Sequence, residues 1–148
     1  MSEDRVERDT LIAAPLERVW PLVAQPGFWV SDPEVAADPA AREGETFVAR
    51  SAEYGEFPVR VEKVDPPAYL AYRWASAFPG EELRADNSTL VEFTLTAEGD
   101  QTRLRVVESG FASLAGTQEL RDQAVKDNTV GWPDAFERFR KRAEQTAR

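Results

Sequence analysis

Residues 89–111, TLVEFTLTAEGDQTRLRVVESGF, contain two runs in which apolar and polar residues alternate. In the first run Val91, Phe93 and Leu95 share one face, and in the second run Leu104 and Val106 share one face. Alternation with a period of two is typical of β-strands with one buried side. Because the residues EGDQ between the runs form a compact turn, we predict two consecutive strands of an antiparallel sheet.

Glu108 is an acidic residue on the apolar side of the second run. A charged group buried there without a partner would cost several kcal/mol, so it should be paired, protonated or near the mouth of a cavity. We expect the partner to be an arginine or a tyrosine. Gly110 indicates a bend just after this residue. Three roles stay open at this point: a structural hydrogen bond, a contact with a ligand, or an acid or base in catalysis.

Further strands are expected at residues 5–13, 45–53, 56–67 and 68–76, joined mostly by short turns. Together with the opening pair they favour an antiparallel meander over crossover units. Read with a period of two, the last three strands place these residues on one side: Phe47, Ala49 and Ser51; Phe57, Val59, Val61 and Lys63; Leu70, Tyr72 and Trp74. Lys63, Ser51 and Tyr72 would therefore join Glu108 as polar groups on the apolar face.

Two regions of the chain have the periodicity of helices. The segment APLERVWPLV has an apolar stripe and places Pro15 at a favourable first helical position, but Pro21 predicts a short or kinked helix. A second short helical turn is possible around residues 26–31. Near the C-terminus Trp132, Phe136, Phe139 and Ala143 form an apolar stripe that Val125 and Asn128 extend backwards, and Pro133 either starts this helix or kinks a longer one beginning near Thr117.

The order of these elements predicts an α+β fold for residues 1–148 as a single domain. We expect a curved antiparallel sheet of about six strands wrapped around the long C-terminal helix, with short helices after the first strand. A sheet with one apolar face needs a cover, and the last helix is the only long amphipathic element in the sequence.

The composition excludes several classes of chemistry. The chain has 148 residues, no Cys and no His, so it cannot form a disulfide, a Ser/His/Asp triad or a zinc site built on imidazole or sulfur. We find no carboxylate metal motif, and we expect neither a metal nor a cofactor. A formal charge of −9 disfavours nucleic acid and anionic membrane surfaces as partners. The absence of a long apolar run or a signal-peptide pattern predicts a cytoplasmic protein.

Four segments, in order, resemble the activator of Hsp90 ATPase homologue-like branch of the START / Bet v 1 superfamily (SRPBCC). They are AAPLERVWPLVAQPGFW, YGEFPVRVEKVDPPAYLAYRW, STLVEFTLTAEGDQTRLRVVESGF and GWPDAFERF, and they span nearly the whole chain. The resemblance implies a helix-grip fold: a strand, two short helices, a six-stranded sheet and a long C-terminal helix around a deep apolar cavity. It implies less about function, because the superfamily includes lipid carriers, cyclases and aromatases, antibiotic-sequestering proteins and chaperone cofactors.

The apolar faces of the predicted elements suggest which residues would line such a cavity. For any one of them, ordinary core packing is the favoured alternative. The candidate ligand-binding residues are Trp29, Phe47, Val59, Val61, Tyr72, Trp74, Phe93, Val106, Glu108, Trp132 and Phe136. No catalytic residue is assigned. Arg84 and Asp86 lie in the connection 78–88, which is either a lid or a solvated loop.

Three functions are compatible with this sequence. The first is a binding protein, more plausibly not an enzyme, for a hydrophobic small molecule of aromatic or polyketide-like character. The second is a cyclase or aromatase in which Tyr72 or Glu108 moves a proton. The third is a chaperone partner that stimulates an ATPase. The chain is expected to be a monomer or a homodimer.

Overall fold

The computed structural model describes residues 5–24, 42–51, 55–75, 83–84 and 86–146. Six strands form one antiparallel sheet in the order β1-β6-β5-β4-β3-β2. The strands are β1 (Arg5–Ile12), β2 (Thr46–Ser51), β3 (Gly55–Asp65), β4 (Tyr69–Trp74), β5 (Thr89–Glu98) and β6 (Gln101–Ser109). The helices are α1 (Leu16–Val23), the short 3-10 helix η1 (Phe111–Ser113) and α2 (Gln118–Thr146). The predicted α+β class and number of strands are confirmed.

The β5–β6 pair is the hairpin that the alternation predicts. Across it Phe93 lies opposite Val106, Leu95 lies opposite Leu104, and Val91 lies opposite Glu108. Residues at odd positions in β5 thus share the buried face with residues at even positions in β6. This register places the Glu108 side chain on the inner face, as the sequence predicted.

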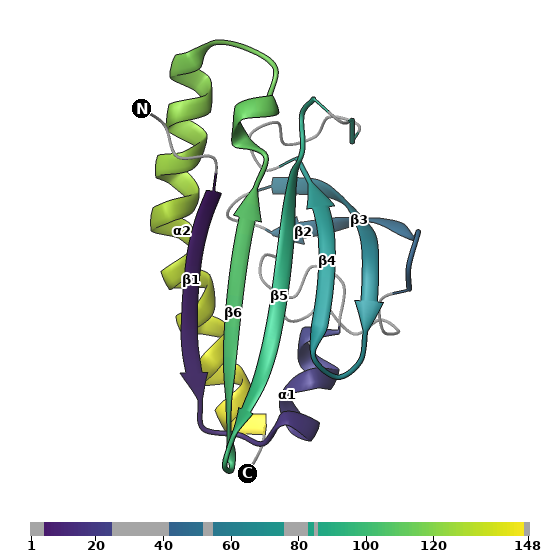
Figure 1. The fold of residues 1–148 in the computed structure, drawn as a ribbon, viewed down its shortest axis with the longest axis vertical. Coiled ribbons are helices and arrows are strands. Elements are labelled where there is room, and N and C mark those ends of the chain that lie inside the picture. Colours follow the sequence, from purple (N-terminus) through teal and green to yellow (C-terminus); the bar gives the residue numbers. More distant parts are fainter. Residues whose placement is uncertain (1–4, 25–41, 52–54, 76–82, 85, 147–148) are drawn as a thin grey trace.

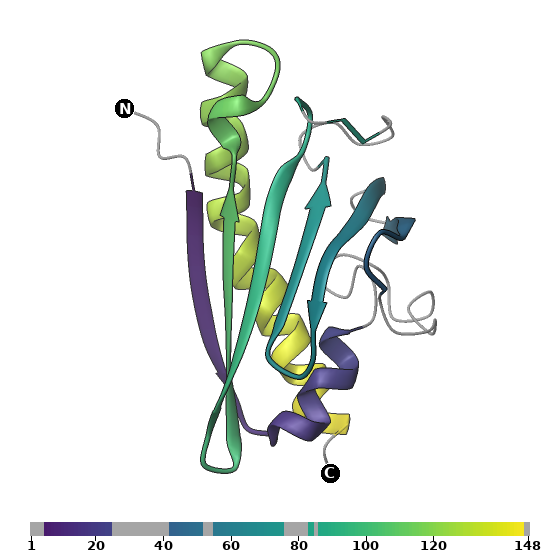
Figure 2. The ribbon, with the colours of Figure 1, turned by 45° about the vertical axis from the view of Figure 1, so that its right-hand side comes forward.

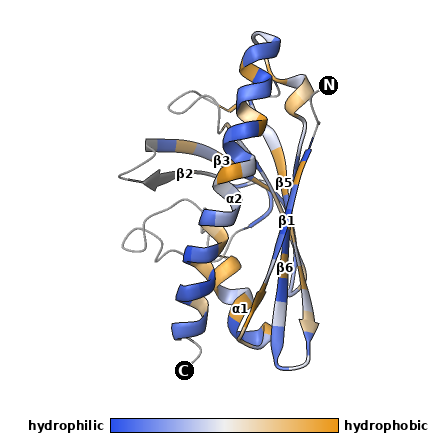
Figure 3. Cartoon of the chain, turned by 90° about the vertical axis from the view of Figure 1, so that its left-hand side faces the viewer, coloured by the Kyte–Doolittle hydropathy of each residue, from blue (hydrophilic) through white to orange (hydrophobic). Residues whose placement is uncertain are grey.

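Helix α2 lies across one face of the sheet, which is the helix-grip arrangement (Figures 1 and 2). It contacts β1, α1 and η1. Viewed along the edge that β1 forms, α2 stands on one side of the sheet (Figure 3). Trp132, Phe136, Phe139 and Ala143 of α2 are all buried, as their spacing predicts.

Pro133 lies inside α2, so the longer of the two predicted helices is the one that forms. The helix begins next to Thr117, whose Oγ1 accepts a hydrogen bond of 3.1 Å from the Leu120 backbone N–H. Threonine is a favoured N-cap residue because its oxygen satisfies a backbone donor that the first turn leaves unpaired.

Helix α1 is short, as Pro21 predicts, and it buries Val19 and Val23. Pro15 is its N-cap residue and does not occupy the first helical position. The second helical turn suggested around residues 26–31 lies outside the described residues. Neither α1 nor α2 is long and apolar enough to cross a membrane, and the same holds for the remaining described helix.

The prediction for Lys63 is wrong, because its side chain is exposed. The register between β3 and β4 shifts between Val61, which lies opposite Tyr72, and Lys63. Such a bulge inserts one residue and reverses the side on which the following residues lie. Val64, opposite Leu70, packs against the core instead.

Candidate functional site

Glu108 is fully buried and is the centre of a hydrogen-bond network that joins the sheet to α2. Oε2 accepts hydrogen bonds from Trp74 Nε1 at 2.9 Å and from Thr89 Oγ1 at 2.5 Å. Oε1 accepts hydrogen bonds from Asn128 Nδ2 at 2.9 Å and from Trp132 Nε1 at 2.8 Å. One carboxylate therefore connects β4, β5, β6 and α2.

The network follows from the register of the central strands. Thr89 lies opposite Trp74 across β4–β5, so both donors reach the same carboxylate oxygen from adjacent strands. The strand ends just beyond Glu108, where Gly110 adopts a left-handed conformation with φ 94°. A residue with a side chain is strained in this conformation, which explains the glycine at this bend. The prediction of an arginine or tyrosine partner is wrong, because neutral indole, hydroxyl and amide groups donate to Glu108 instead.

The environment of Glu108 acts on its pKa in two directions. Burial raises the pKa above the ordinary glutamate value, whereas the hydrogen bonds lower it, with that of Thr89 first among them. A carboxylate offers about four lone-pair positions, and four donors occupy them here. Burial is the larger effect, so the pKa of Glu108 is raised overall. The four hydrogen bonds give the carboxyl group a structural role, and a role in contacting a ligand stays a prediction.

An aromatic cluster surrounds the carboxylate, with Trp132 at its centre. The ring centroid of Trp132 lies 6.0 Å from that of Trp74, 5.7 Å from that of Phe93 and 5.9 Å from that of Phe136. Phe57 extends the cluster from Trp74 at 5.6 Å. Tilted and edge-on pairs at these separations add to the stability that burial provides.

The structure brings most of the predicted site residues together in this buried core. The members of the core cluster among them are Val59, Val61, Tyr72, Trp74, Phe93, Val106, Trp132 and Phe136. Burial raises the pKa of the Tyr72 hydroxyl. Trp29 lies outside the described residues, and only the backbone of Phe47 is described, in β2. These residues pack against one another, and their contact with a ligand stays a prediction.

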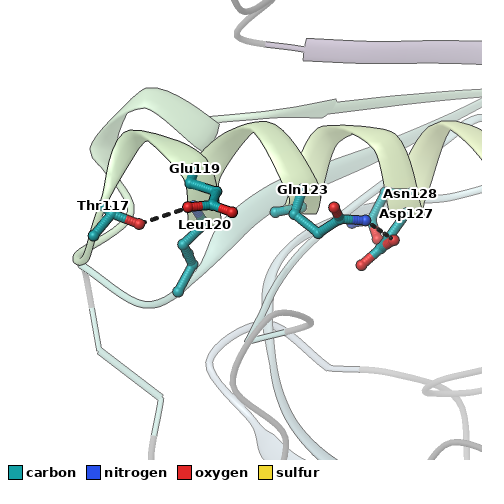
Figure 4. A pocket seen from close by; sticks show the side chains of 7 residues that line it. Thr117, Glu119, Leu120, Gln123, Asp127 and Asn128 are labelled. Carbon is teal, nitrogen blue, oxygen red and sulfur yellow. Dashed lines mark hydrogen bonds between the residues drawn. The ribbon is translucent and has the colours of Figure 1, made fainter.

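A pocket of about 470 Å³ lies beside the first half of α2 (Figure 4). Its described lining residues all belong to one stretch of chain at the start of the helix: Thr117, Glu119, Leu120, Gln123, Ala124, Asp127 and Asn128. None of them is a predicted site residue. The wall combines the apolar side chains of Leu120 and Ala124 with a hydroxyl, two amides and two carboxylates.

The sequence contains a signal that could have located this pocket. Leu120, Ala124, Asn128 and Trp132 are spaced by four residues, so they continue the buried stripe of α2 towards its N-terminus. Ala124 and Asn128 are smaller than the aromatic residues further along the stripe, so they fill less of the space beside the helix.

Asn128 belongs to both the pocket and the buried network. It lines the cavity and also donates its 2.9 Å hydrogen bond to Glu108 Oε1. A molecule in the pocket would therefore touch a residue that is itself fixed by the carboxylate at the centre of the domain. This shared residue makes the pocket the candidate functional site.

The predicted lid is described only at its C-terminal end. Asp86 accepts a 2.6 Å hydrogen bond at its backbone oxygen from the Ala115 N–H, which joins this end to the segment before α2. The Arg84 and Asp86 side chains are more than half exposed and form an ion pair at 3.4 Å. Movement of the loop as a lid stays a prediction. Within the described part of the chain, no group of acidic residues could hold a metal ion.

Comparison with known proteins identifies a family. The family model described as "Activator of Hsp90 ATPase homolog 1-like protein" matches residues 13–144. No curated protein matches the sequence.

Several solved structures have the same fold. BH1534 from Bacillus halodurans is 24% identical, with all of both chains covered and a TM-score of 0.68. The Aha1 dimer from Colwellia psychrerythraea is 17% identical over 95% of this chain and 96% of that chain, with a TM-score of 0.68. DynU16, a protein in the dynemicin biosynthetic locus, is 22% identical over 94% of this chain and 46% of that chain, with a TM-score of 0.66. At these identities the likeness concerns the fold.

Proposed function

This chain belongs to the activator of Hsp90 ATPase homolog 1-like family, and on that basis we propose that it binds a small, largely apolar molecule in the pocket beside α2. The observation that carries the proposal is the position of Asn128, which lines the pocket and donates to the buried Glu108. The described wall combines the apolar side chains of Leu120 and Ala124 with polar groups, and small-molecule sites commonly combine the two.

The volume of the pocket supports this function. About 470 Å³ falls in the range of roughly 300–1,000 Å³ that ligand pockets occupy. Phe93 and Trp74 of the central strands pack against Trp132 of α2. The space that we propose for a ligand lies beside Leu120 and Ala124.

An aromatic or polyketide-like ligand is the chemical class that we favour. DynU16, which shares the fold, is a protein in the dynemicin biosynthetic locus, although this chain spans less than half of its length. Within the pocket the apolar side chains of Leu120 and Ala124 would contact the body of such a compound.

The other two functions have less support. For an acid or base, the Glu108 lone pairs would have to be released from four donors before a proton could move. A role as a chaperone partner rests on the family description and on the Colwellia psychrerythraea relative, which is a dimer, and on no described surface of this chain. A monomer or homodimer stays our prediction for its own assembly.

A pair of tryptophan substitutions in α2 tests the binding site. Gln123 lines the pocket with an exposed side chain, so Gln123→Trp fills the cavity without disturbing the core. Lys126 is exposed in the same helix and does not line the pocket, so Lys126→Trp is the matched control. Naphthyl and anthraquinone compounds would be screened for binding by saturation-transfer NMR and their affinities measured by calorimetry.

We expect Gln123→Trp to weaken binding of the compounds found by about tenfold or more, which corresponds to about 1.4 kcal/mol. Lys126→Trp should leave the affinity within about twofold of the original. Equal affinities for the two variants would place binding elsewhere and overturn the proposed site.

A further inference from the structure

We propose that the pocket beside α2 selects ligands that donate hydrogen bonds or carry a positive charge, and discriminates against ligands that carry a carboxylate. The inference rests on the proposed function, and it specifies the polar half of the ligand. It follows from the orientation of two amides and from the charges of the described wall.

The orientation of the Asn128 amide is determined by Glu108. A carboxylate can only accept hydrogen bonds, so the group that Asn128 directs at Oε1, 2.9 Å away, is its NH₂. The carbonyl oxygen of the same amide is directed away from Glu108. That oxygen has two lone pairs, so a ligand donor can share it with another partner. Asn128 therefore offers an acceptor to the pocket that it lines.

Gln123 is oriented in the same way by a second carboxylate. Its Nε2 donates a 2.8 Å hydrogen bond to Asp127 Oδ1 one turn further along α2, as Figure 4 shows. The Oε1 atom of Gln123 is then the acceptor that this side chain offers. Both amides of the wall thus direct nitrogen to a carboxylate, with the carbonyl oxygen on the opposite side of the amide.

The remaining polar groups of the wall favour the same ligands. Glu119 and Asp127 are acceptors with negative charge, and no Lys or Arg is among the described residues that line the pocket. The Thr117 oxygen already accepts the N–H of Leu120. The whole chain carries a formal charge of −9, so the field at this wall favours a cation over an anion.

The ligand class that fits is an apolar, flat body with an amine or hydroxyl group at one end. Leu120 and Ala124 would contact the apolar body, and the donor group would lie between Asn128 and Asp127. A carboxylate at that end would lie near the negatively charged Glu119 and Asp127, with no Lys or Arg among the described lining residues to bind it.

Three probes with the same aromatic ring test this selectivity. Naphthylethylamine is a cation with donors, naphthylethanol is a neutral donor, and naphthylacetic acid is an anion at neutral pH. Calorimetric titration of the full chain should show affinity decreasing in that order. The advantage of the amine over the alcohol should also shrink as salt is added, because screening weakens a charge interaction at an open wall.

Isosteric variants identify the groups responsible. Asp127→Asn and Glu119→Gln remove charge while retaining an acceptor, and each should weaken the amine by about two- to fivefold with little effect on the alcohol. Glu17→Gln is the control, because Glu17 is exposed on α1, at the end of the domain away from the start of α2 (Figure 1). It makes the same change in net charge and should alter no affinity. Circular dichroism and thermal melting would verify folding.

The possible outcomes separate the selectivity from the binding function. Tight binding of the acid that is lost in Gln123→Trp would overturn the selectivity and leave the pocket as the binding site. Equal sensitivity of amine and alcohol to Asp127→Asn would also overturn the selectivity. Binding of none of the probes, nor of any screened compound, would overturn the proposed function and this inference with it.

Discussion

The indole nitrogen of Trp132 in α2 lies 2.8 Å from Oε1 of Glu108 in β6, and this hydrogen bond fastens the long helix to the centre of the sheet. The other carboxylate oxygen binds Trp74 of β4 and Thr89 of β5. The aromatic rings supply apolar area, while the carboxylate fixes where their polar edges point. Glu108 therefore determines the orientation of α2 as well as its attachment.

Replacing Glu108 with glutamine should destabilise the protein. The amide has one oxygen and one NH₂ group, so its NH₂ would face an indole N–H that it cannot bind, whereas the Thr89 hydroxyl or the Asn128 amide can turn to accept. A buried donor left without an acceptor costs about 1–3 kcal/mol, and we expect the free energy of unfolding to decrease by that amount. Urea denaturation of Glu108→Gln against the original chain measures this difference.

Glu98→Gln is the matched control for that experiment. Glu98 binds Arg103 at 2.6 Å on the exposed side of the β5–β6 hairpin. Exposed ion pairs contribute about 1 kcal/mol or less, so the control should lose no more than that. A similar loss in both variants would contradict the structural importance of Glu108.

Protonation of Glu108 should be visible at the two indole N–H groups that it binds. Burial raises its pKa above the ordinary value of 4.5, so the native state takes up the proton at a higher pH than the unfolded chain does. The contribution of this group to stability accordingly decreases as the pH rises from the unfolded to the native pKa. In NMR spectra the indole signals of Trp74 and Trp132 should titrate above pH 4.5. The Trp20 indole on α1 is the reference, and titration of the pair below that pH would contradict the prediction.

The sequence predicted the side on which Glu108 lies but not its partners. Alternation sets the face of every residue in the β5–β6 hairpin, so the inward position of Glu108 follows from local pattern. Its partners come from β4, β5 and α2, which meet only in the folded sheet. The expectation of arginine or tyrosine assumed that charge or a phenol must balance the carboxylate. Four neutral donors do so instead.

The alternation of apolar and polar residues could not predict two other features. The alternating pattern does not indicate the bulge between Val61 and Lys63. We therefore applied a single alternation to the whole strand, which assigned Lys63 to the wrong face. The cavity expected on the inner face of the sheet stays a prediction. The pocket beside α2 was not predicted, because it depends on how the part of the helix with Ala124 and Asn128 packs in the folded chain.

Tyr69 should remain protonated well beyond the usual range of a tyrosine. Burial comes first among the causes that raise its pKa to about 12, followed by its hydrogen bond to Glu92 Oε2 at 2.5 Å. The native pKa exceeds the unfolded value of 10.0, so this group stabilises the fold fully below pH 10 and loses the contribution as the pH rises towards 12. Tyrosinate absorbance of the original chain and of Tyr69→Phe isolates the step. Glu92→Gln should lower this pKa, and an unchanged titration would contradict the role of Glu92.

Two threonines of the α2 region should respond in opposite directions to the same substitution. Thr117→Ala removes the N-cap and should lower the free energy of unfolding by about 1 kcal/mol. Thr129 lies inside the helix, and its hydroxyl donates to the Val125 carbonyl at 2.6 Å. Alanine is the better helix former there, so Thr129→Ala should be neutral or add about 0.5 kcal/mol. Equal losses in thermal or urea denaturation would show that Thr117 does not act as a cap.

Asn128→Asp should lower the free energy of unfolding by an amount that depends on pH. The substitution replaces an NH₂ donor 2.9 Å from Glu108 Oε1 with a second carboxylate. A half-buried carboxylate at this separation from the buried Glu108 disfavours ionisation of both groups, so the pair should retain one proton at a pH where the unfolded Asp and Glu have lost theirs. The native state then binds more protons than the unfolded state, and the sign of the linkage requires stability to rise as the pH falls. We expect a loss of about 3–5 kcal/mol at neutral pH, partly regained in mild acid.

The matched control is Gln123→Glu. This change also converts an amide that binds a carboxylate, here that of Asp127 in α2, but on an exposed surface. It should cost no more than about 0.5 kcal/mol. A constant difference between Asn128→Asp and the original chain across this pH range, measured by urea denaturation, would show that Asn128 and Glu108 are not coupled.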